Sequence, residues 1–441
     1  MAGAGPAEEG RSSFGAYEFP EAPAAPASGL DAGARQAASE LGAALIGGGF
    51  DGEALDTLGA SDDPRWAWLI SDMLRFAQPG ARQVALIDAF VALTGVDPGE
   101  DPSFAESPWL SITNHLIAWD LPAPMGYREL KGELYTALEP GWRPFFADVD
   151  SELDYRLLSW GGVLIDDRPE GSTEPCERGC IPALDDPPLT DASRGDWYPD
   201  DRIVFGVEVG GEAVALPKNI MEVHEMANIT VGGRRLGIPY CTLCGSAQAY
   251  FTDQDQFMGE PLVLRTSGLL SRSNKVMYEL NSRSAFDTFT GEALTGPLRK
   301  RGLELDQASV VTTNWGDWRE AHPDTRIIAS DGGTGQSYPP DPLGGRDDNG
   351  PIFPVGPVDP RLPVQEPVLG VIAADRTPVA FAVAAAKAAL ERGEEVSAAG
   401  VELIFDGAGL GARGVHGDQL PAHEAFWFAW SQFHPETELW G

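Results

Sequence analysis

The 441-residue sequence is poor in basic side chains, with 31 lysines and arginines against 67 aspartates and glutamates. Its formal net charge is therefore -36 at pH 7. A surface of this sign repels phosphate backbones and anionic lipid head groups, so a role in binding nucleic acid or a membrane surface is disfavoured. We interpret the acidity as a contribution to solubility.

The sequence also has no apolar run long enough to span a bilayer. Residues 1–30 are rich in Ala, Pro, Gly and Glu and lack the basic start and apolar core of a signal peptide, so they predict a disordered leader. We therefore expect a cytoplasmic protein. The hydrophobic content of 43% predicts a folded chain, and the length predicts at least two domains.

Several common catalytic motifs are missing. There is no G-x-S-x-G elbow, P-loop, Rossmann glycine fingerprint or H-E-x-x-H sequence. Their absence argues against a serine hydrolase, a nucleotide kinase, a nicotinamide enzyme and a zincin protease.

Residues 31–149 have the pattern of a helical domain. Apolar residues recur at three- to four-residue spacing in segments that Gly, Pro and Asp turns separate. In DDPRWAWLISDMLRFA, Asp62 or Asp63 together with Pro64 predicts a helix start. We expect a helical repeat or bundle, in which His115 is a packing residue.

Residues 150–441 have the pattern of a mostly β domain. Short β-rich runs such as Ile203–Val209 and Ala213–Leu216 are separated by Gly-containing turns, which predict hairpins. Residues 331–360 are rich in Gly, Pro and Asp and predict a long irregular loop. The predicted fold class is α+β, with an all-helical N-terminal domain before a mostly β domain.

The β domain contains an internal repeat. The sequences WGDWREAHPDT and WFAWSQFHPET, which begin at Trp315 and Trp427, both fit W-x-x-W-x-x-x-H-P-[DE]-T. We predict a duplicated module, with copy one at about 203–329 and copy two at about 368–441. A gap-free alignment of the copies sets Asp406, Gly409 and Ala389 opposite Cys241, Cys244 and His224. On this alignment, the second copy lacks the two cysteines and the histidine together.

The four cysteines are the strongest chemical signal. Cys241 and Cys244 form a C-x-x-C pair that follows a predicted buried strand, where two thiolates can reach one soft metal ion. His224 precedes the pair by one predicted helix and strand and is the candidate third ligand. His434 is a further candidate ligand, although its place before Pro435 at a helix end equally fits a packing role.

Other interpretations of the cysteines remain open. Cys241 and Cys244 would form a dithiol redox couple if they were exposed, had a lowered pKa and lay near a cation. They would be inert if they only filled a core. A closed four-cysteine zinc cluster with Cys176 and Cys180 is a structural alternative, although C-x-x-x-C is a loose spacing for one.

The ordered motifs IPALDDP, HEMANITVGG, YCTLCGSA, SGLLSRSN, TGEALTGPL and FHPET resemble a bacterial and archaeal family of domains of unknown function, family 3179. The resemblance covers about residue 160 to the C-terminus and excludes the helical part. Thr242 and Ser271 replace a proline and an aromatic residue of the family pattern, and residues 286–289 replace its W-S-Q element. The resemblance implies a shared polar signature at His224, Glu225, Asn228, Tyr240, Cys241, Cys244, Ser267, Gly268, Asn274 and His434.

These observations give one leading hypothesis and its competitors. We expect a metal-dependent oxidoreductase acting on a small molecule or peptide, with copper or iron favoured and zinc as an alternative. Its metal ligands are Cys241, Cys244, His224 and His434, and its catalytic residues are Glu225, Asn228, Tyr240, Ser267 and Asn274. The alternatives are a non-enzymatic zinc-stabilised module, with the helical domain as a surface for a protein partner, and a thiol–disulfide redox protein.

Overall fold

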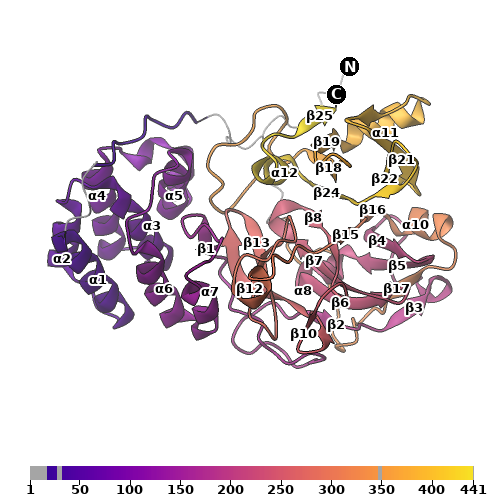
Figure 1. The fold of residues 1–441 in the computed structure, drawn as a ribbon, viewed down its shortest axis with the longest axis horizontal. Coiled ribbons are helices and arrows are strands. Elements are labelled where there is room, and N and C mark those ends of the chain that lie inside the picture. The colour runs from indigo at the N-terminus through magenta and orange to yellow at the C-terminus, as the bar shows by residue number, and fades with distance from the viewer. Residues whose placement is uncertain (1–16, 27–31, 346–349, 441) are drawn as a thin grey trace, which may run out of the picture. The chain divides into compact units, whose positions relative to one another are not determined.

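The structure is a computed structural model that describes residues 17–26, 32–345 and 350–440. The chain divides into two compact units (Figure 1). Of the described residues, the first unit contains 17–26, 32–161, 270–273 and 350–358, and the second unit contains the rest. Among the described residues, no helix is long and apolar enough to cross a membrane.

The first unit is helical, as the sequence predicts. Asp63 accepts a hydrogen bond from the main-chain N–H of Arg65 and begins the turn before α3, so the expected Asp-Pro start is confirmed. The α-helices of this unit are α1 (Ala32–Ile46), α2 (Gly52–Gly59), α3 (Ala67–Phe76), α4 (Ala81–Thr94), α5 (Pro108–Ala118), α6 (Tyr127–Leu138) and α7 (Arg143–Ala147).

Two segments outside these helices pack against α5. Residues 17–26, which the sequence places in a disordered leader, lie against α5 instead, because Tyr17 bonds to His115 at 3.1 Å and Trp119 donates to the carbonyl of Pro20. The other residues of the predicted leader, 1–16 and 27–30, lie outside the described residues. In the predicted long loop, the N–H groups of Val355 and Gly356 both donate to Asn114 Oδ1 at 2.9 Å.

The second unit is mostly β, and one of its sheets has the strand order β16-β4-β5-β17-β3. These strands are β3 (Leu189–Asp191), β4 (Ile203–Val209), β5 (Glu212–Pro217), β16 (Val311–Asn314) and β17 (Arg326–Ile328). Strands β4 and β5 form the hairpin that the sequence predicts, while β17 runs parallel to β5. Helix α10 (Trp315–Ala321) connects β16 to β17.

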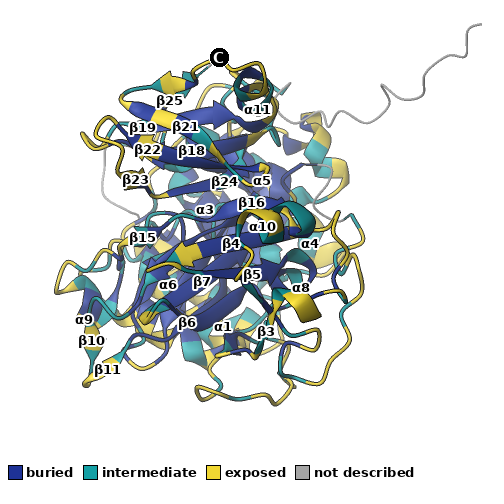
Figure 2. Ribbon diagram, turned by 90° about the vertical axis from the view of Figure 1, so that its right-hand side faces the viewer, coloured by how far each residue is buried: buried dark blue, intermediate teal, exposed yellow. Residues whose placement is uncertain are grey.

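A second sheet, β24-β18-β19-β25, has the same plan. Its elements are β18 (Pro367–Ile372), β19 (Pro378–Ala382), β24 (Ala422–Phe426), α12 (Trp427–Phe433) and β25 (Glu438–Trp440). Again the first two strands form a hairpin, and the last strand runs parallel beside it. The sheets lie edge to edge across β16 and β24 (Figure 2), where the N–H of Val310 donates to the carbonyl of Ala422.

The two W-x-x-W-x-x-x-H-P motifs make the same contacts. Trp318 Nε1 donates to Thr325 at 2.9 Å, and Trp430 Nε1 donates to Thr437 at 2.8 Å. His322 and His434 end their helices and lie with ring centroids 3.9 and 4.3 Å from the second tryptophan of each motif. Both rings therefore pack on a tryptophan, and His322 in addition bonds through Nε2 to Asp406 at 2.8 Å.

The hairpins after these sheets do not fit the gap-free alignment predicted from the sequence. Helix α8 (Lys218–His224) leads to β6 (Met226–Val231) and β7 (Arg234–Cys241), while α11 (Val383–Glu391) leads to β21 (Val401–Asp406) and β22 (Gly409–Gly414). The turn at Gly232-Gly233 therefore matches the turn after Asp406, and Asp406 matches Val231 instead of Cys241. The gap-free alignment failed because it ignored the different lengths of the helix and loop before each hairpin.

The remaining strands complete the second unit. Strand β7 pairs with β6, β8 and β9 and so lies inside its sheet. The remaining strands and helix are β2 (Leu184–Asp185), β8 (Ser246–Ala247), β9 (Ala249–Phe251), β10 (Gln256–Phe257), β11 (Glu260–Pro261), β12 (Leu264–Ser271), β13 (Asn274–Glu279), β14 (Ala285–Asp287), α9 (Gly296–Arg299), β15 (Gln307–Ala308), β20 (Ser397–Ala398) and β23 (Gln419–Leu420).

Candidate functional site

The C-x-x-C pair lies where β7 ends and a short 3-10 turn begins. Cys241 is the last residue of β7, and the turn Thr242–Cys244 carries the second cysteine. Neither cysteine is part of a disulfide, and their exposed fractions are 2% and 0%. Gly245 then takes a left-handed conformation, and a side chain there would meet the ring of Phe426 at 3.0 Å. This close approach fixes the direction in which the chain leaves the turn.

Lys275, on β13, brings a positive charge to the pair. Its ammonium lies 2.7 Å from Glu225 Oε2 and donates to the main-chain carbonyls of Glu225 and Tyr240, both at 2.8 Å. The side chains of Lys275 and Glu225 are 6% and 11% exposed, so their interaction is little screened by water. The ammonium is therefore held in place beside the end of β7.

Glu225 is held in an unusual backbone conformation. It follows α8 with φ of +51°, a left-handed geometry that costs a non-glycine residue about 1 kcal/mol. Its N–H donates to Met221, its carbonyl accepts from Tyr240, and its Oε1 accepts from Thr242 at 3.3 Å. These bonds aim the carboxylate at Lys275 and at the turn that contains the cysteines.

The two thiols have opposite tendencies to ionise. Burial raises the pKa of Cys241, but a hydrogen bond with Cys244, the charge of Lys275 and the main-chain N–H of Lys275 lower it, and the result lies below the ordinary value. Burial raises the pKa of Cys244 well above its ordinary value, and the interaction with Cys241 raises it further. Of the two thiols, Cys241 therefore ionises more readily, and the Cys244 thiol is the hydrogen-bond donor of the pair.

Polar atoms surround this pair. Cys244 Sγ lies 3.7 Å from Asn274 Oδ1, and Cys241 is paired across the β7–β8 ladder with Ser246. In the described part of the chain, the buried atoms Asn274 Nδ2 and Ser246 Oγ have no hydrogen-bond partner. Since buried polar groups are normally bonded, these two atoms can bind polar groups of a co-reactant or water.

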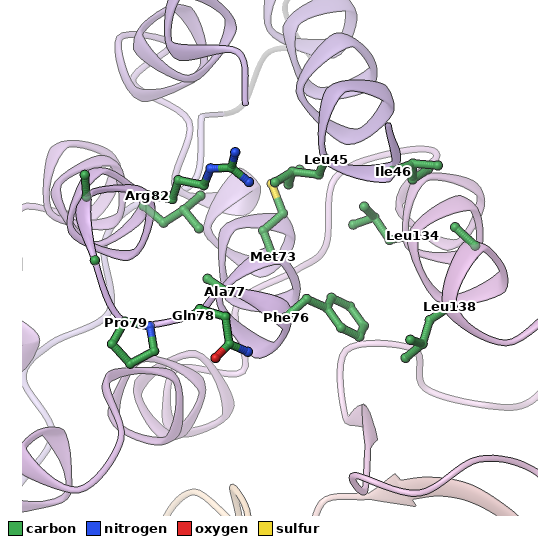
Figure 3. A pocket seen from close by; sticks show the side chains of 14 residues that line it. Leu45, Ile46, Met73, Phe76, Ala77, Gln78, Pro79, Arg82, Leu134 and Leu138 are labelled. Atoms are coloured by element: carbon green, nitrogen blue, oxygen red, sulfur yellow. The ribbon is translucent and has the colours of Figure 1, made fainter. Parts of the chain in front are cut away.

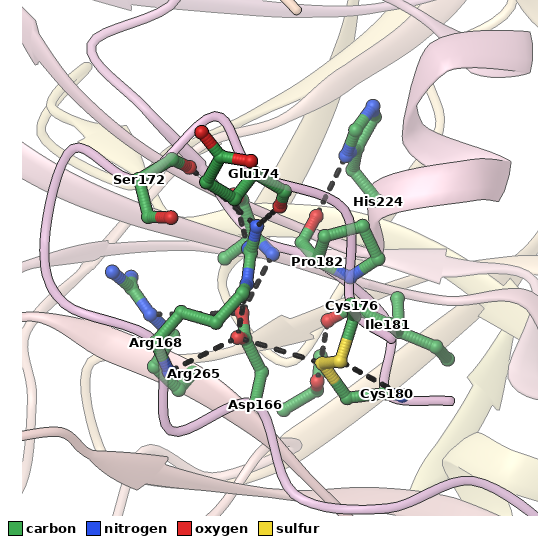
Figure 4. Close-up of a disulfide and its surroundings, with 12 residues drawn as sticks. Asp166, Arg168, Ser172, Glu174, Cys176, Cys180, Ile181, Pro182, His224 and Arg265 are labelled. Carbon is green, nitrogen blue, oxygen red and sulfur yellow. Dashed lines mark hydrogen bonds and ion pairs between the residues drawn. A yellow bond between two sulfur atoms is a disulfide. The ribbon is translucent and has the colours of Figure 1, made fainter. Parts of the chain in front are cut away.

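We call the pair and the residues around it the cysteine cluster: Glu225, Cys241, Thr242, Cys244, Ser246, Asn274 and Lys275. His224 is not part of this cluster, although the sequence predicts it as a ligand. Its Nδ1–H donates to the carbonyl of Pro182 at 2.6 Å, as Figure 4 shows, and its Nε2 accepts from the Tyr338 hydroxyl at 2.6 Å. Both ring nitrogens are therefore engaged, and burial lowers the pKa of the imidazole. The ring connects the loop after Cys180 to Tyr338, a residue of the predicted 331–360 loop.

His434 is also engaged elsewhere, in an aromatic cluster with Trp430 and Phe289. Burial lowers the pKa of His434 to about 4. Its neighbour His423 bonds through Nδ1 to Gln307 at 2.9 Å and through Nε2 to Gln248 at 3.4 Å. A neutral imidazole has one donor and one acceptor, so one of these glutamines must present its carbonyl oxygen.

The expected metal centre is not assembled. In the residues that the structure describes, no group of three or more His, Cys, Asp or Glu side chains is placed to hold a metal ion. The four-cysteine alternative is not formed either, because Cys176 and Cys180 are joined to each other by a disulfide. Cys180 Sγ lies 3.6 Å from Asp166, which pairs with Arg168 at 2.6 Å (Figure 4).

Three of the predicted catalytic residues have structural roles. Asn228 joins β6 to β12 through a pair of 3.0 Å bonds with the main chain of Leu264. The ring of Tyr240 packs on Phe205 in the core, with centroids 4.7 Å apart. Ser267 bonds to the main chain of Val276 and Leu269. The side chains of the other two predicted catalytic residues, Glu225 and Asn274, contact Lys275 and Cys244 respectively.

Lys275 and Thr242 also belong to the site but are not among the residues predicted from the sequence. Lys275 lies in NKVMYE, a strand in which every residue is buried. A lysine inside such an apolar run is a signal of a buried ion pair, because a buried ammonium needs a partner. The sequence has no comparable signal for Thr242. Its contact with Glu225 depends on the tertiary packing of the end of α8 against the turn Thr242–Cys244.

Comparison with known proteins agrees with the resemblance seen in the sequence. No curated protein and no solved structure matches the chain. One family model, described as a protein of unknown function, DUF3179, matches residues 178–409. This range contains the whole cysteine cluster and the first sheet, but it ends before β24 and α12. The chain therefore belongs to the DUF3179 family.

Proposed function

We propose that Cys241 and Cys244 form a dithiol–disulfide redox centre. The observation that carries this proposal is the buried Lys275 ammonium beside Cys241. Its charge and a hydrogen bond from the Cys244 thiol lower the pKa of Cys241. A cation and a lowered pKa are two of the three features that distinguish a redox thiol from an inert one. The third feature, exposure, is lacking, and this limits the co-reactant.

The exchange needs two balanced steps. The Cys241 thiolate attacks one sulfur of a disulfide, R–S–S–R, to form a mixed disulfide and release one thiolate, RS⁻. Cys244 transfers its proton to that thiolate and attacks Cys241 Sγ. The Cys241–Cys244 disulfide forms and the second RS⁻ leaves. The pair loses two electrons, and the substrate disulfide gains them.

The roles of the neighbouring residues follow from their contacts. Lys275 stabilises the attacking thiolate, and Glu225 fixes the position of the ammonium. Asn274 Nδ2 and Ser246 Oγ can bind a polar group beside the sulfur under attack. Since both thiols are buried, the co-reactant is a small disulfide that enters after a local opening of the Thr242–Gly245 turn.

We also infer that the two matching sheets arose by duplication of one module. The support is the shared strand order and the equivalent Trp–Thr hydrogen bonds of the two copies. The two copies differ at the end of the second hairpin strand, where the first copy alone has the cysteines. In this account the second copy supplies a scaffold, and the first copy carries the chemistry.

The proposal is tested with 5,5′-dithiobis(2-nitrobenzoate), a small disulfide whose reduction releases a coloured thiolate. The background is Cys176→Ser/Cys180→Ser, so that only one pair can react. We expect two thiolates per chain and an intramolecular disulfide by mass spectrometry. With Cys244→Ser added, we expect one thiolate and a stable mixed disulfide, because the second attack is removed.

Cys241→Ser provides the directional control. We expect it to react much more slowly than Cys244→Ser, since the remaining Cys244 thiol has a raised pKa. Equal rates for the two single variants would contradict Cys241 as the nucleophile. No release of thiolate from the folded background protein would contradict the redox centre itself.

A further inference from the structure

The helical unit contains a large pocket that is separate from the cysteine cluster. Its volume is about 660 Å³, within the range of ~300–1,000 Å³ that is usual for pockets of small ligands. It is lined by residues of α1, α3, α4 and α6 and of the turn between α3 and α4. All of these elements belong to the first unit.

The floor and walls of the pocket are apolar (Figure 3). Met73, Leu86 and Leu134 are buried beneath it, with exposed fractions of 2%, 0% and 7%. Ile46 and Leu138 lie at its rim and are 48% and 39% exposed, so the apolar surface of the pocket continues to its edge. An occupant with an apolar body would cover both.

One edge of the pocket is polar and positively charged. Arg82 is the one charged side chain among the lining residues, and it lies on the same side as Gln78, opposite Leu134 and Leu138 (Figure 3). Its guanidinium donates to the carbonyl of Gly48 at 3.3 Å, and no ion pair within the described ranges joins it to a carboxylate. Helix α4 begins beside it without a side-chain cap, which adds partial positive charge to this edge.

We infer that this pocket binds a free amphiphile that has one carboxylate and an unbranched apolar tail. The tail would lie on Met73 and Leu134 and cover Ile46 and Leu138, while the carboxylate would pair with Arg82. The sign of the head group is a specific claim, because the chain carries a net charge of -36. Long-range attraction would favour a cationic amphiphile, whereas the local charge of Arg82 and the start of α4 favours an anionic one.

The test compares three ligands with tails of one length, decanoate, decanol and decylammonium, by calorimetric titration of the full chain below micelle concentrations. We expect decanoate to bind most tightly. Arg82→Gln should weaken decanoate binding roughly fivefold, as expected for loss of one exposed ion pair, and leave decanol binding unchanged. Arg143→Gln, at an exposed arginine of α7 outside the pocket, should match the wild type.

A second variant tests the location. Ala137 is an exposed residue of α6 that lines the pocket, so Ala137→Trp should fill it without disturbing the core. We expect this variant to keep the wild-type melting temperature and lose decanoate binding. Unchanged binding in Ala137→Trp, or tightest binding of decylammonium, would overturn the inference. Binding to phosphatidylglycerol vesicles with none to decanoate would also overturn it, in favour of a membrane surface.

Discussion

At the scale of single residues, the reactivity of the site depends on the opposing charges of Lys275 and Glu225. The charge of Lys275 lowers the pKa of Cys241, whereas the charge of Glu225 raises it by a smaller amount. Both side chains are buried, so removing one of them alone leaves the other without its counter-ion. Replacing both residues by neutral ones removes both charges and leaves no buried charge unpaired, so the effect on the thiol can be measured apart from the effect on folding.

We predict opposite shifts for two variants. Glu225→Gln should lower the pKa of Cys241 below that of the wild type, and Lys275→Met/Glu225→Gln should raise it above that of the wild type. The pH dependence of iodoacetamide alkylation, read by mass spectrometry in the Cys176→Ser/Cys180→Ser background, measures both. If the double variant kept the wild-type profile, Lys275 would have no role in activating the thiol.

A buried histidine makes the stability of the second unit depend on pH. Burial lowers the pKa of His423 to about 3 from an unfolded value of about 6.5, so the unfolded chain binds the proton more readily. Stability from this residue is complete above about pH 6.5 and is lost as the pH falls towards 3. The free energy of unfolding of the wild type should fall when the pH is lowered from 7 to 5. In His423→Gln this fall should be smaller by about 2 kcal/mol.

Urea titrations at pH 7 and pH 5 measure this difference. His416→Gln is the matched control, because His416 is exposed on the same unit. The two variants should diverge at pH 5, and the same pH dependence in both would contradict the assignment to His423.

Sequence reasoning at the residue scale found the two cysteines, Glu225 and Asn274, but it placed two wrong partners beside them. His224 and His434 share the polar character of ligands, yet each has its own neighbours in the fold. The relevant partner, Lys275, lies 34 residues after Cys241 on a strand that packs beside β7. Such a contact depends on tertiary packing, which a spacing rule does not describe.

At the scale of elements, the repeated sheets depend on a glycine beneath a tryptophan. An added Cβ at Gly206 or at Gly370 would collide with the ring of Trp318 or Trp430. Each glycine lies in the first strand of a hairpin, β4 or β18, so the ring packs directly on the main chain. The sequence motif revealed the tryptophans, but the glycines were recognisable only from the structure.

We predict that Gly206→Ala and Gly370→Ala each destabilise the chain by about 1–3 kcal/mol, the usual range for overpacking a core. Gly42→Ala is the control, because nothing lies within 4 Å of its added Cβ in α1 and alanine favours a helix by ~0.5–1 kcal/mol. Thermal unfolding followed by circular dichroism measures all three. A neutral effect of both strand substitutions would contradict the packing described for these tryptophans.

At the scale of the whole molecule, composition and periodicity predicted the helical first unit and the mostly β second unit. They did not predict that residues 350–358, distant in sequence, belong to the first unit. A loop rich in glycine and proline has no periodicity that shows where it packs. The cytoplasmic location stays a prediction, and the Cys176–Cys180 disulfide is of a kind that is uncommon in that compartment.

The net charge of -36 gives one prediction for the intact chain. We expect no binding to duplex DNA in fluorescence anisotropy titrations, even at low salt, where electrostatic attraction to phosphates is strongest. A salt-dependent rise in anisotropy would show a basic surface that the overall charge conceals.

The central claim is that Cys241 and Cys244 interconvert between a dithiol and a disulfide in the folded protein. The most direct measurement is an equilibrium titration of the Cys176→Ser/Cys180→Ser chain in buffers of reduced and oxidised dithiothreitol, with acid trapping and mass spectrometry of the Cys241–Cys244 peptide. We expect a single reversible two-electron transition. A pair that stays fully reduced in every buffer, while the chain remains folded, would contradict it.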